Sequence, residues 1–413
     1  MLQEHDASKS QLLSDHHSIL KNCGSGFGSV PKGQAPITCP PQVVSHSSID
    51  TLHLSLFTDV SRTDLLDKIE KHRELARDQE LEKIPFKYFS ADFNVHRSGR
   101  RFFTYQISTA DTHIFFNRRN PHGTFPTCLI EIGSQSSWNP GVFEIFKNIE
   151  SYFQFAGIEI LKHTISRVDL CTDFIDQPFK KFDFGNVEKW ICRANHFGVF
   201  YSGRIASGIS YGKGNLILRV YDKRKELSDK KATAKQEFFN HIWQETSSPV
   251  TRVEFQLRRE AINELRYGAG KQKIETIYDL LYAQNAIWSY CVKHWARHTA
   301  IAVDWENKNH QRTPVSDFWK MVQDVKFLKN NPSDIARIKT KKDYVDAEAL
   351  VNQGVGCLLA ASACSIESTD QIEELLDIAS EHLSIRVKNQ MKCRYQELEQ
   401  KIQTVINSNR LSI

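Results

Sequence analysis

Three segments in the middle of the chain alternate apolar and polar residues, as a β-strand does when one of its faces lies in a core. They cover residues 167–174, 215–223 and 250–258. In the second segment leucine and valine occupy one face, and Arg219, Tyr221 and Lys223 share the other. Taken alone, such a tyrosine is more often a half-buried strand residue with solvated neighbours. The polar faces of the other two segments therefore decide its interpretation.

The first and third segments carry carboxylates and cations on their polar faces. These residues are Arg167, Asp169 and Asp173 in the first, and Arg252, Glu254, Gln256 and Arg258 in the third. If the three strands share a sheet, one side is core and the other gathers three carboxylates, several cations and one tyrosine. The alternative is that each carboxylate only pairs with its own arginine neighbour on the surface, which contributes little stability. We favour the first interpretation, a site that cuts a phosphodiester.

The rest of the pattern predicts an α+β fold. Alternation predicts strands near residues 49–56, 101–107, 112–117, 127–133, 197–202 and 209–212. Helical spacing of apolar residues predicts helices over 62–79, 140–155, 185–195, 232–245 and 278–298. Together these elements predict an antiparallel-rich sheet with helices on one face, built from two related βαβ-like halves and followed by a mainly helical C-terminal region.

The same pattern divides the chain into three regions. Residues 1–47 are rich in Ser, His, Gly and Pro without periodicity and are predicted to be a mostly disordered leader. Residues 48–265 form the predicted nicking domain, and residues 266–413 the helical region. A basic stretch in the helical region includes Lys339, Lys341 and Lys342. This stretch is either a solvated helix face or a surface that contacts DNA phosphates, and we favour contact with DNA.

Composition narrows the class of protein. The formal charge is +5 over 413 residues, which permits nucleic-acid binding without requiring it. The nine cysteines are odd in number and include no C-x-x-C pair, so we expect reduced thiols and neither a disulfide framework nor a zinc site. The sequence shows no signal-peptide pattern and no apolar stretch long enough to cross a bilayer. We therefore expect a cytoplasmic protein without a membrane partner.

Tyr221 is the candidate nucleophile. A tyrosine that attacks a phosphodiester becomes covalently attached to phosphate, and its phenolate is also a good leaving group, so the bond can be resealed. The ordinary pKa of a tyrosine is about 10. We expect Arg219 and Lys223 to favour the phenolate and to hold phosphate oxygens. Neither of the rival nucleophiles, Tyr201 and Tyr211, has a cation both two residues before it and two residues after it.

The carboxylates Asp169, Asp173 and Glu254 predict a metal site. Their hard oxygen ligands suit Mg²⁺ or Mn²⁺, which would neutralise charge at the scissile phosphate. Another nicking fold holds its metal with two histidines separated by one residue. No two histidines in this chain have that spacing, which excludes that mechanism.

Four motifs in order resemble the replication initiation factor family. They are RVDLCTDF at 167–174, a glycine-rich hairpin at 201–214, LRVYDKRKEL at 218–227 and TRVEFQLRRE at 251–260. The family includes initiators of rolling-circle plasmids and of some filamentous phages, and the related relaxases of conjugative elements. The resemblance covers roughly residues 48–265. It implies that Tyr221 is the nucleophile and that Asp169, Asp173 and Glu254 belong to the metal site.

The resemblance implies a bacterial or phage rolling-circle replication initiator that nicks one strand of an origin, stays on the 5′ phosphate and leaves a 3′-OH primer. A relaxase and a non-catalytic DNA-binding regulator on the same fold stay open as alternatives. The implied partners are origin DNA, double-stranded and locally single-stranded, and a host helicase, while a homo-oligomer is left open. The cations expected to contact DNA are Arg167, Arg204, Lys213, Arg252, Arg258, Lys339, Lys341 and Lys342.

Overall fold

A computed structural model describes residues 44–88, 91–118, 122–123, 125–268, 270–328, 335–338 and 354. The chain divides into two compact units, Met1–Val44 and Ser45–Ile413, and every element below belongs to the second. Most of the predicted leader lies outside the described residues, but its last residues already belong to the first strand. Lys339, Lys341 and Lys342 also lie outside the described residues.

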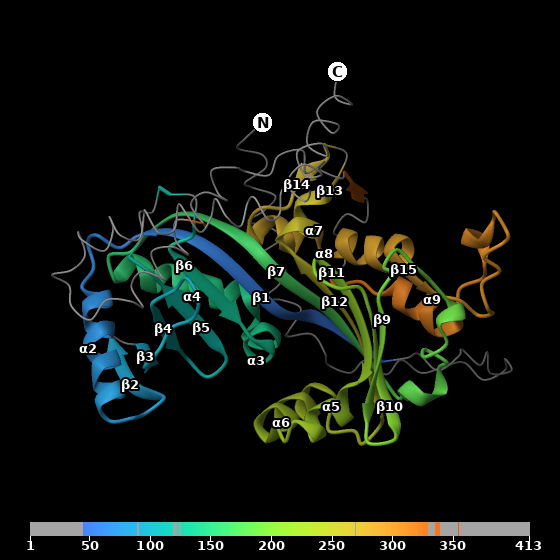
Figure 1. Ribbon diagram of the computed structural model, residues 1–413, viewed down its shortest axis with the longest axis horizontal. Helices are drawn as coiled ribbons and strands as arrows, with labels where there is room; N and C mark the ends of the chain where they lie inside the picture. The colour runs from blue at the N-terminus through green and yellow to red at the C-terminus, as the bar shows by residue number, and fades with distance from the viewer. Residues whose placement is uncertain are drawn as a thin grey trace, which may run out of the picture. The chain divides into compact units, whose positions relative to one another are not determined.

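The centre of this unit is an 11-stranded sheet with the order β2-β3-β4-β5-β6-β1-β7-β12-β11-β10-β9 (Figure 1). The strands are β1 (Ser45–Asp59), β2 (Lys83–Tyr88), β3 (Ala91–His96), β4 (Tyr105–Ser108), β5 (Thr112–Phe116), β6 (Cys128–Ile132), β7 (Glu159–Ile175), β9 (Phe197–Ser202), β10 (Ile205–Tyr211), β11 (Leu216–Asp222) and β12 (Val250–Arg258). Each pair of adjacent strands in this order is antiparallel. The predicted α+β class and antiparallel sheet are confirmed.

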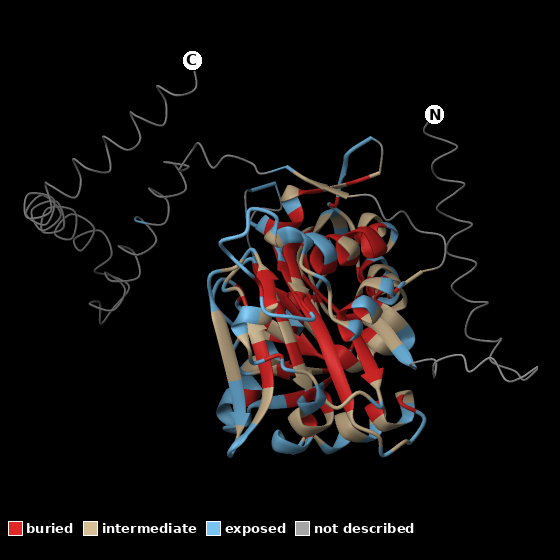
Figure 2. Cartoon of the chain, turned by 90° about the vertical axis from the view of Figure 1, so that its right-hand side faces the viewer, coloured by how far each residue is buried: buried red, intermediate tan, exposed pale blue. Residues whose placement is uncertain are grey.

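One face of the sheet forms the core under a layer of helices. These helices are α2 (Leu65–Asp78), α4 (Val142–Phe155), α8 (Ile277–Tyr290) and α9 (Asp317–Asp324). Trp288 of α8 packs edge-on against Phe255 of β12, with ring centroids 5.4 Å apart. Phe318 of α9 packs against Phe174 of β7, with ring centroids 5.1 Å apart. Figure 2 shows that the buried residues concentrate in the central strands and the helix surfaces that face them.

The helices α5 (Lys223–Asp229) and α6 (Thr233–Ile242) pack against the opposite face, at one end of β12. Leu227, Phe239 and Trp243 form a buried cluster there with Val250. Val250 lies two residues before Arg252, so both point to the polar face. The predicted helical layer on one face is therefore supplemented by this pair on the other.

The remaining short elements are α3 (Ser134–Ser136), α7 (Arg259–Glu264), β8 (Trp190–Cys192), β13 (Leu265–Tyr267), β14 (Gln272–Lys273), β15 (Ala296–His298) and β16 (Ile335–Arg337), together with the 3-10 and π-helices η1 (Ser137–Gly141), η2 (Phe179–Lys181), η3 (Val187–Lys189), η4 (Cys291–Trp295) and η5 (His310–Arg312). Strand β8 replaces the helix predicted over 185–195, and β15 ends the helix predicted over 278–298. These two strands pair with each other. The prediction over 185–195 was wrong because this pairing, which sequence periodicity does not reveal, satisfies the backbone there in place of a helix. The helix predicted over 278–298 is confirmed over most of its length by α8 and the π-helix Cys291–Trp295, and only its last three residues form β15 instead. Within the described part of the chain, no helix is both long and apolar enough to cross a membrane.

The strand that carries Tyr221 is shorter than predicted. It ends at Asp222, whose side chain accepts a hydrogen bond from the Lys225 backbone N–H and so caps α5. Lys223 is therefore the first residue of a helix and does not continue the strand face.

A candidate active site on the polar face of the sheet

The three predicted strands are neighbours in the order β7-β12-β11, which confirms that they share a sheet. Their register places Arg219 opposite Glu254 and Tyr221 opposite Arg252. Arg252 in turn lies opposite Asp173. Because directly opposed residues point to the same face, the polar side chains of all three strands gather on one side of the sheet.

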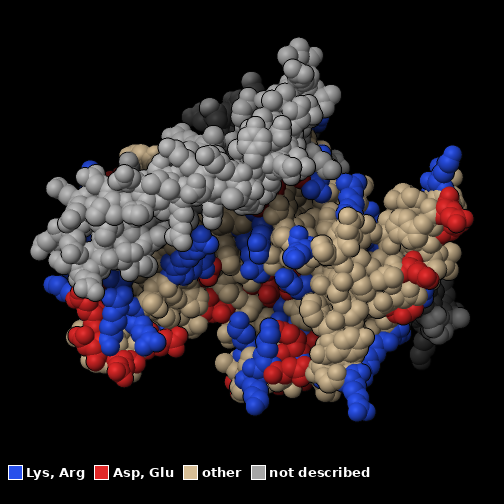
Figure 3. Space-filling view, viewed as in Figure 1, with Lys and Arg blue, Asp and Glu red and all other residues tan. Residues whose placement is uncertain are grey.

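These side chains border a cavity of about 660 Å³, whose walls come from the strands and from α5 and α6. Its lining includes Tyr221, Glu254, Asp169, Arg219, Lys223 and Arg167. Figure 3 shows Lys and Arg side chains gathered around a hollow in the middle of this face, with acidic side chains between them. The arrangement can hold the negative phosphates of a ligand at its rim while carboxylates lie deeper.

Tyr221 and Glu254 form the centre of the site. The Tyr221 hydroxyl donates a hydrogen bond to Glu254 Oε2 over 2.8 Å, and Arg219 Nη1 donates to Glu254 Oε1 over 2.8 Å. Burial of the phenol, and then the Glu254 carboxylate beside it, raise the pKa of Tyr221 well above its usual range. The prediction of a phenolate favoured by Arg219 and Lys223 was therefore wrong for the free site. The tyrosine is neutral, and its proton points at a carboxylate.

Lys223 reaches the site from α5. Its ammonium lies 2.9 Å from Glu226 Oε2 and 5.6 Å from the centroid of the Tyr221 ring. It is buried and lines the cavity. Helix α5 thus brings a cation next to the tyrosine ring by a route that the strand pattern did not predict.

Asp169 is the second carboxylate of the cavity. Arg167 holds it with two hydrogen bonds, from Nε to Oδ1 over 2.9 Å and from Nη2 to Oδ2 over 2.5 Å. The side chain is 2% exposed. Burial, together with the nearby charge of Glu254, raises the pKa of Asp169 to about 7. Asp169 is consequently able to exchange a proton near neutral pH.

Asp173 has a different role from the predicted one. Arg252 donates from Nε to Asp173 Oδ1 over 2.5 Å and from Nη2 to Oδ2 over 2.7 Å, and Trp243 Nε1 donates to Oδ2 over 2.9 Å. Both the carboxylate and the guanidinium are 0% exposed. The rings of Trp138 and Phe239 also lie against the Arg252 guanidinium. Asp173 therefore does not line the cavity, and Arg252 is too deeply buried for the predicted DNA contact.

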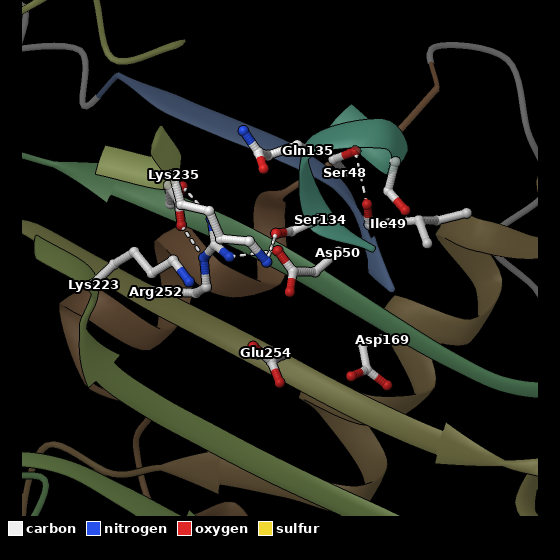
Figure 4. Close-up of polar contacts among 12 residues, drawn as sticks. Ser48, Ile49, Asp50, Ser134, Gln135, Asp169, Lys223, Lys235, Arg252 and Glu254 are labelled. Carbon is white, nitrogen blue, oxygen red and sulfur yellow. Dashed lines mark hydrogen bonds and ion pairs between the residues drawn. The ribbon is translucent and has the colours of Figure 1, made fainter. Parts of the chain in front are cut away.

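Asp50 belongs to the site and was missed. It accepts a hydrogen bond from Arg252 Nη1 over 2.6 Å and lines the cavity together with Asp169 and Glu254 (Figure 4). Burial opposes its negative charge, but Arg252 and Lys223 nearby lower its pKa. The residue sits at a β-bulge, where the pairing of β1 with β7 shifts between Ile49 and Thr51.

The signal that could have found Asp50 is its position in the strand. By simple alternation it shares the face of Leu52 and Leu54, which are fully buried in the core. An uncompensated carboxylate there would be costly. A bulge that turns the side chain to the polar face resolves this conflict.

The predicted metal is chemically compatible with the cavity because its carboxylates are hard oxygen ligands. However, among the described residues no three His, Cys, Asp or Glu side chains converge in a geometry that would hold an ion. Three of the carboxylates that line the cavity already have an arginine partner: Arg252 for Asp50, Arg167 for Asp169 and Arg219 for Glu254. The arrangement does not fit a preformed metal centre, and Mg²⁺ or Mn²⁺ stays a prediction.

The remaining predicted DNA contacts are spread over the surface. Arg167 and Arg258 are directly opposed on β7 and β12, and Arg258 is exposed. Arg204 lies in the turn between β9 and β10, whereas Lys213 lies in the turn between β10 and β11. The two residues are therefore at opposite ends of β10 and do not form the single reading element that was predicted.

The rival tyrosines are poorly placed. Tyr211 points to the core face, where its ring packs between Trp190 and Phe197 with centroids 5.2 and 4.6 Å away. Burial raises the pKa of its hydroxyl above the usual range. Tyr201 is 65% exposed on β9 and does not line the cavity. Of the three candidates, only Tyr221 has a carboxylate and cations around its hydroxyl.

No protein-family model matches the chain, and no curated protein is similar to it. Among solved structures, the chain is similar to a rolling-circle replication initiator protein from Geobacillus stearothermophilus. That similarity has 14% sequence identity and a TM-score of 0.36, and it covers 69% of this chain and 99% of the other. At that level the similarity carries no inference about function, which is argued below from the site itself.

Proposed function

We propose that the protein is a replication initiator that nicks one strand of an origin through Tyr221. The observation that supports this most directly is the 2.8 Å hydrogen bond from the Tyr221 hydroxyl to Glu254 inside a cavity lined by Arg219, Lys223 and Arg167. This geometry supports the proposal because one cavity holds a tyrosine hydroxyl, a carboxylate that accepts its hydrogen bond, and cations that could bind phosphate. The order of the four sequence motifs supports placing this chemistry in rolling-circle replication.

The proposed step transfers a phosphoryl group from DNA to the tyrosine. The Tyr221 oxygen forms a bond to phosphorus while the bond from phosphorus to the neighbouring 3′ oxygen breaks. The phenolic proton moves to Glu254, and the leaving 3′ oxygen takes a proton from Asp169, whose pKa of about 7 leaves it partly protonated at neutral pH. The products are a 5′-phosphotyrosine and a 3′-OH, and the reverse transfers reseal the strand.

The cations of the cavity have a separate task. Arg219 holds Glu254 with one nitrogen and Gln256 Oε1 with the other, 3.0 Å away, and its side chain is still 30% exposed. The Lys223 ammonium lies 5.6 Å from the centroid of the Tyr221 ring. Positive groups in these positions would stabilise the charge that develops on the phosphate oxygens. A divalent ion bound by the cavity carboxylates would supply the same stabilisation, and we keep it as part of the proposal.

The test uses the full-length protein and supercoiled DNA that carries its own replicon. With Mg²⁺ or Mn²⁺ we expect a nicked product with protein on its 5′ end, and peptide mapping by mass spectrometry should place the adduct on Tyr221. Tyr221→Phe should abolish the adduct and keep DNA binding, because only the hydroxyl is lost. Tyr201→Phe is the matched control and should form the adduct at the parental level.

Two results would change the proposal. An undiminished adduct in Tyr221→Phe would move the nucleophile elsewhere and end this assignment. DNA binding without any adduct in the parental protein would favour the non-catalytic regulator. A relaxase would perform the same step, so cleavage at a conjugative transfer origin instead of a replication origin would identify that alternative. Loss of cleavage on adding a chelator would support the metal.

A further inference from the structure

One cross-strand row links the candidate nucleophile to the edge of the sheet. Tyr221 on β11 lies opposite Gly208 on β10, and Gly208 lies opposite Phe200 on the edge strand β9. Directly opposed residues point to the same face. The side chains of Tyr221 and Phe200 therefore stand on the site face with only a glycine between them.

The glycine leaves room that any other residue would fill. A Cβ atom on Gly208 would lie 2.8 Å from Tyr221 Cβ and 3.5 Å from Phe200 Cδ2. Neighbouring strands are about 4.8 Å apart, so the two aromatic residues are rooted about 10 Å from each other. Between the two side chains lies only the backbone of Gly208, and both aromatic residues line the same cavity.

Phe200 presents its ring to solvent in this position and is 51% exposed. An exposed ring beside a cavity lined with arginine and lysine suits a ligand with both a flat apolar face and negative charge. An unpaired nucleotide has this combination, because its base can stack on an aromatic ring while its phosphate meets the cations. An apolar side chain from a protein partner would use the ring but would make no polar contact with the arginine and lysine side chains of the cavity.

We propose that Phe200 is the stacking platform for the unpaired base next to the phosphate that Tyr221 attacks. This inference rests on the proposed function and adds a positioning residue to it. Stacking tolerates any base, because every base has a π-face. Phe200 would therefore select for an unpaired nucleotide at the cleaved bond and would contribute little to the choice of sequence.

The binding test uses full-length Tyr221→Phe protein, which holds the strand without cutting it. The probe is a heptathymidylate with 2-aminopurine at its central position, whose fluorescence falls when the base stacks. We expect quenching on binding. Adding Phe200→Ala should weaken affinity about five- to one-hundred-fold, the usual effect of removing one base–aromatic stack, and should abolish the quenching.

Two further variants separate stacking from other effects. Tyr201→Ala removes the neighbouring ring, which is 65% exposed and does not line the cavity, and should keep both affinity and quenching. Phe200→Leu keeps an apolar side chain without a π-face and should behave like alanine. The inference is overturned if Phe200→Ala binds and quenches like its parent. It is also overturned if leucine fully replaces phenylalanine, which would indicate a generic apolar contact.

The outcome is distinguishable from failure of the proposed function. If the parental protein forms the Tyr221 adduct but Phe200 has no effect on the probe, only the stacking inference fails. If Phe200 governs quenching but no adduct forms on replicon DNA, the cavity binds a single strand without cutting it. In that case the stacking platform stands and the nicking proposal fails.

Discussion

The two ends of the polar face on β7 and β12 use the same residue types for different purposes. At one end, Asp173 and Arg252 are 0% exposed and are joined by two hydrogen bonds under the aromatic side chains of α6. At the other end, Asp169 and Glu254 border an open cavity next to Tyr221. What distinguishes the two ends is the α5–α6 pair, which covers the first and stops short of the second.

This difference shows how coverage changes the meaning of a carboxylate. A buried ion pair such as Asp173–Arg252 costs much to break, because the partner is left charged in a dry environment. At the open end, burial instead raises the pKa of Asp169 to about 7 and that of Tyr221 well above its usual range, so at neutral pH Tyr221 is protonated and Asp169 is partly protonated. We assign structure to the covered end and proton transfer to the open end.

The strongest test of the comparison is to break the covered end. Asp173→Ala leaves Arg252 with Asp50 as its one remaining ionic partner among the described residues and should lower the free energy of unfolding by about 3–5 kcal/mol. Chemical denaturation measures this directly. Asp229→Ala is the control: it removes an exposed carboxylate near the cavity, and the loss should stay below about 1 kcal/mol. Equal stability of the two variants would mean that Asp173 is not structural.

At the open end, Glu254→Gln should mainly affect chemistry. Glutamine keeps the shape and can still contact Tyr221, but it cannot accept the phenolic proton. We expect the single-turnover rate of adduct formation to fall about a hundredfold or more, while DNA affinity is kept. Restoration of the rate by raised Mn²⁺ would contradict the proton-acceptor role and would make Glu254 a metal ligand.

Another effect at the open end should appear in the pH dependence of stability. The pKa of Asp169 is about 7 in the folded chain, against about 4 in an unfolded one. Between these values the folded state binds more protons than the unfolded state. The contribution of Asp169 to stability is therefore fully present below about pH 4 and is lost as the pH rises through 7, with a slope of at most about 1.4 kcal/mol per pH unit.

Asp169→Asn removes this titration. Relative to the parental protein, the variant should gain stability steadily between pH 5 and pH 7 at about the slope given above, and no further beyond pH 8. Thermal unfolding at a series of pH values measures the difference. A difference that does not change with pH would show that Asp169 is ionised throughout this range.

The sequence alone predicted the strands that carry the site and the residue at its centre. Alternation of apolar and polar residues is a reliable guide there because one face of each strand lies in the core. It therefore assigned Tyr221 and Glu254 to the same face from the sequence alone. Alternation cannot show which part of that face a later helix will cover. That is why Asp173 and Arg252 were grouped with the open site.

Other differences have equally local causes. Asp50 escaped notice because a bulge breaks the period of two. Lys223 was placed on a strand because the capping of α5 by Asp222 was not recognised. Arg204 and Lys213 were combined because they flank one short strand in the sequence, although a strand keeps its two ends far apart.

The hydrogen bonds between the two halves of the sheet have a consequence for protein chimeras. Asp50 of β1 accepts a hydrogen bond from Arg252 of β12. Lys235 of α6 donates a hydrogen bond over 3.2 Å to the hydroxyl of Ser134, which lies in the segment after β6. The cavity around Tyr221 is thus assembled from both halves of the sheet. A chimera that joined the first half of this chain to the second half of a different protein with the same fold would keep the cavity only if both residues of each pair were kept.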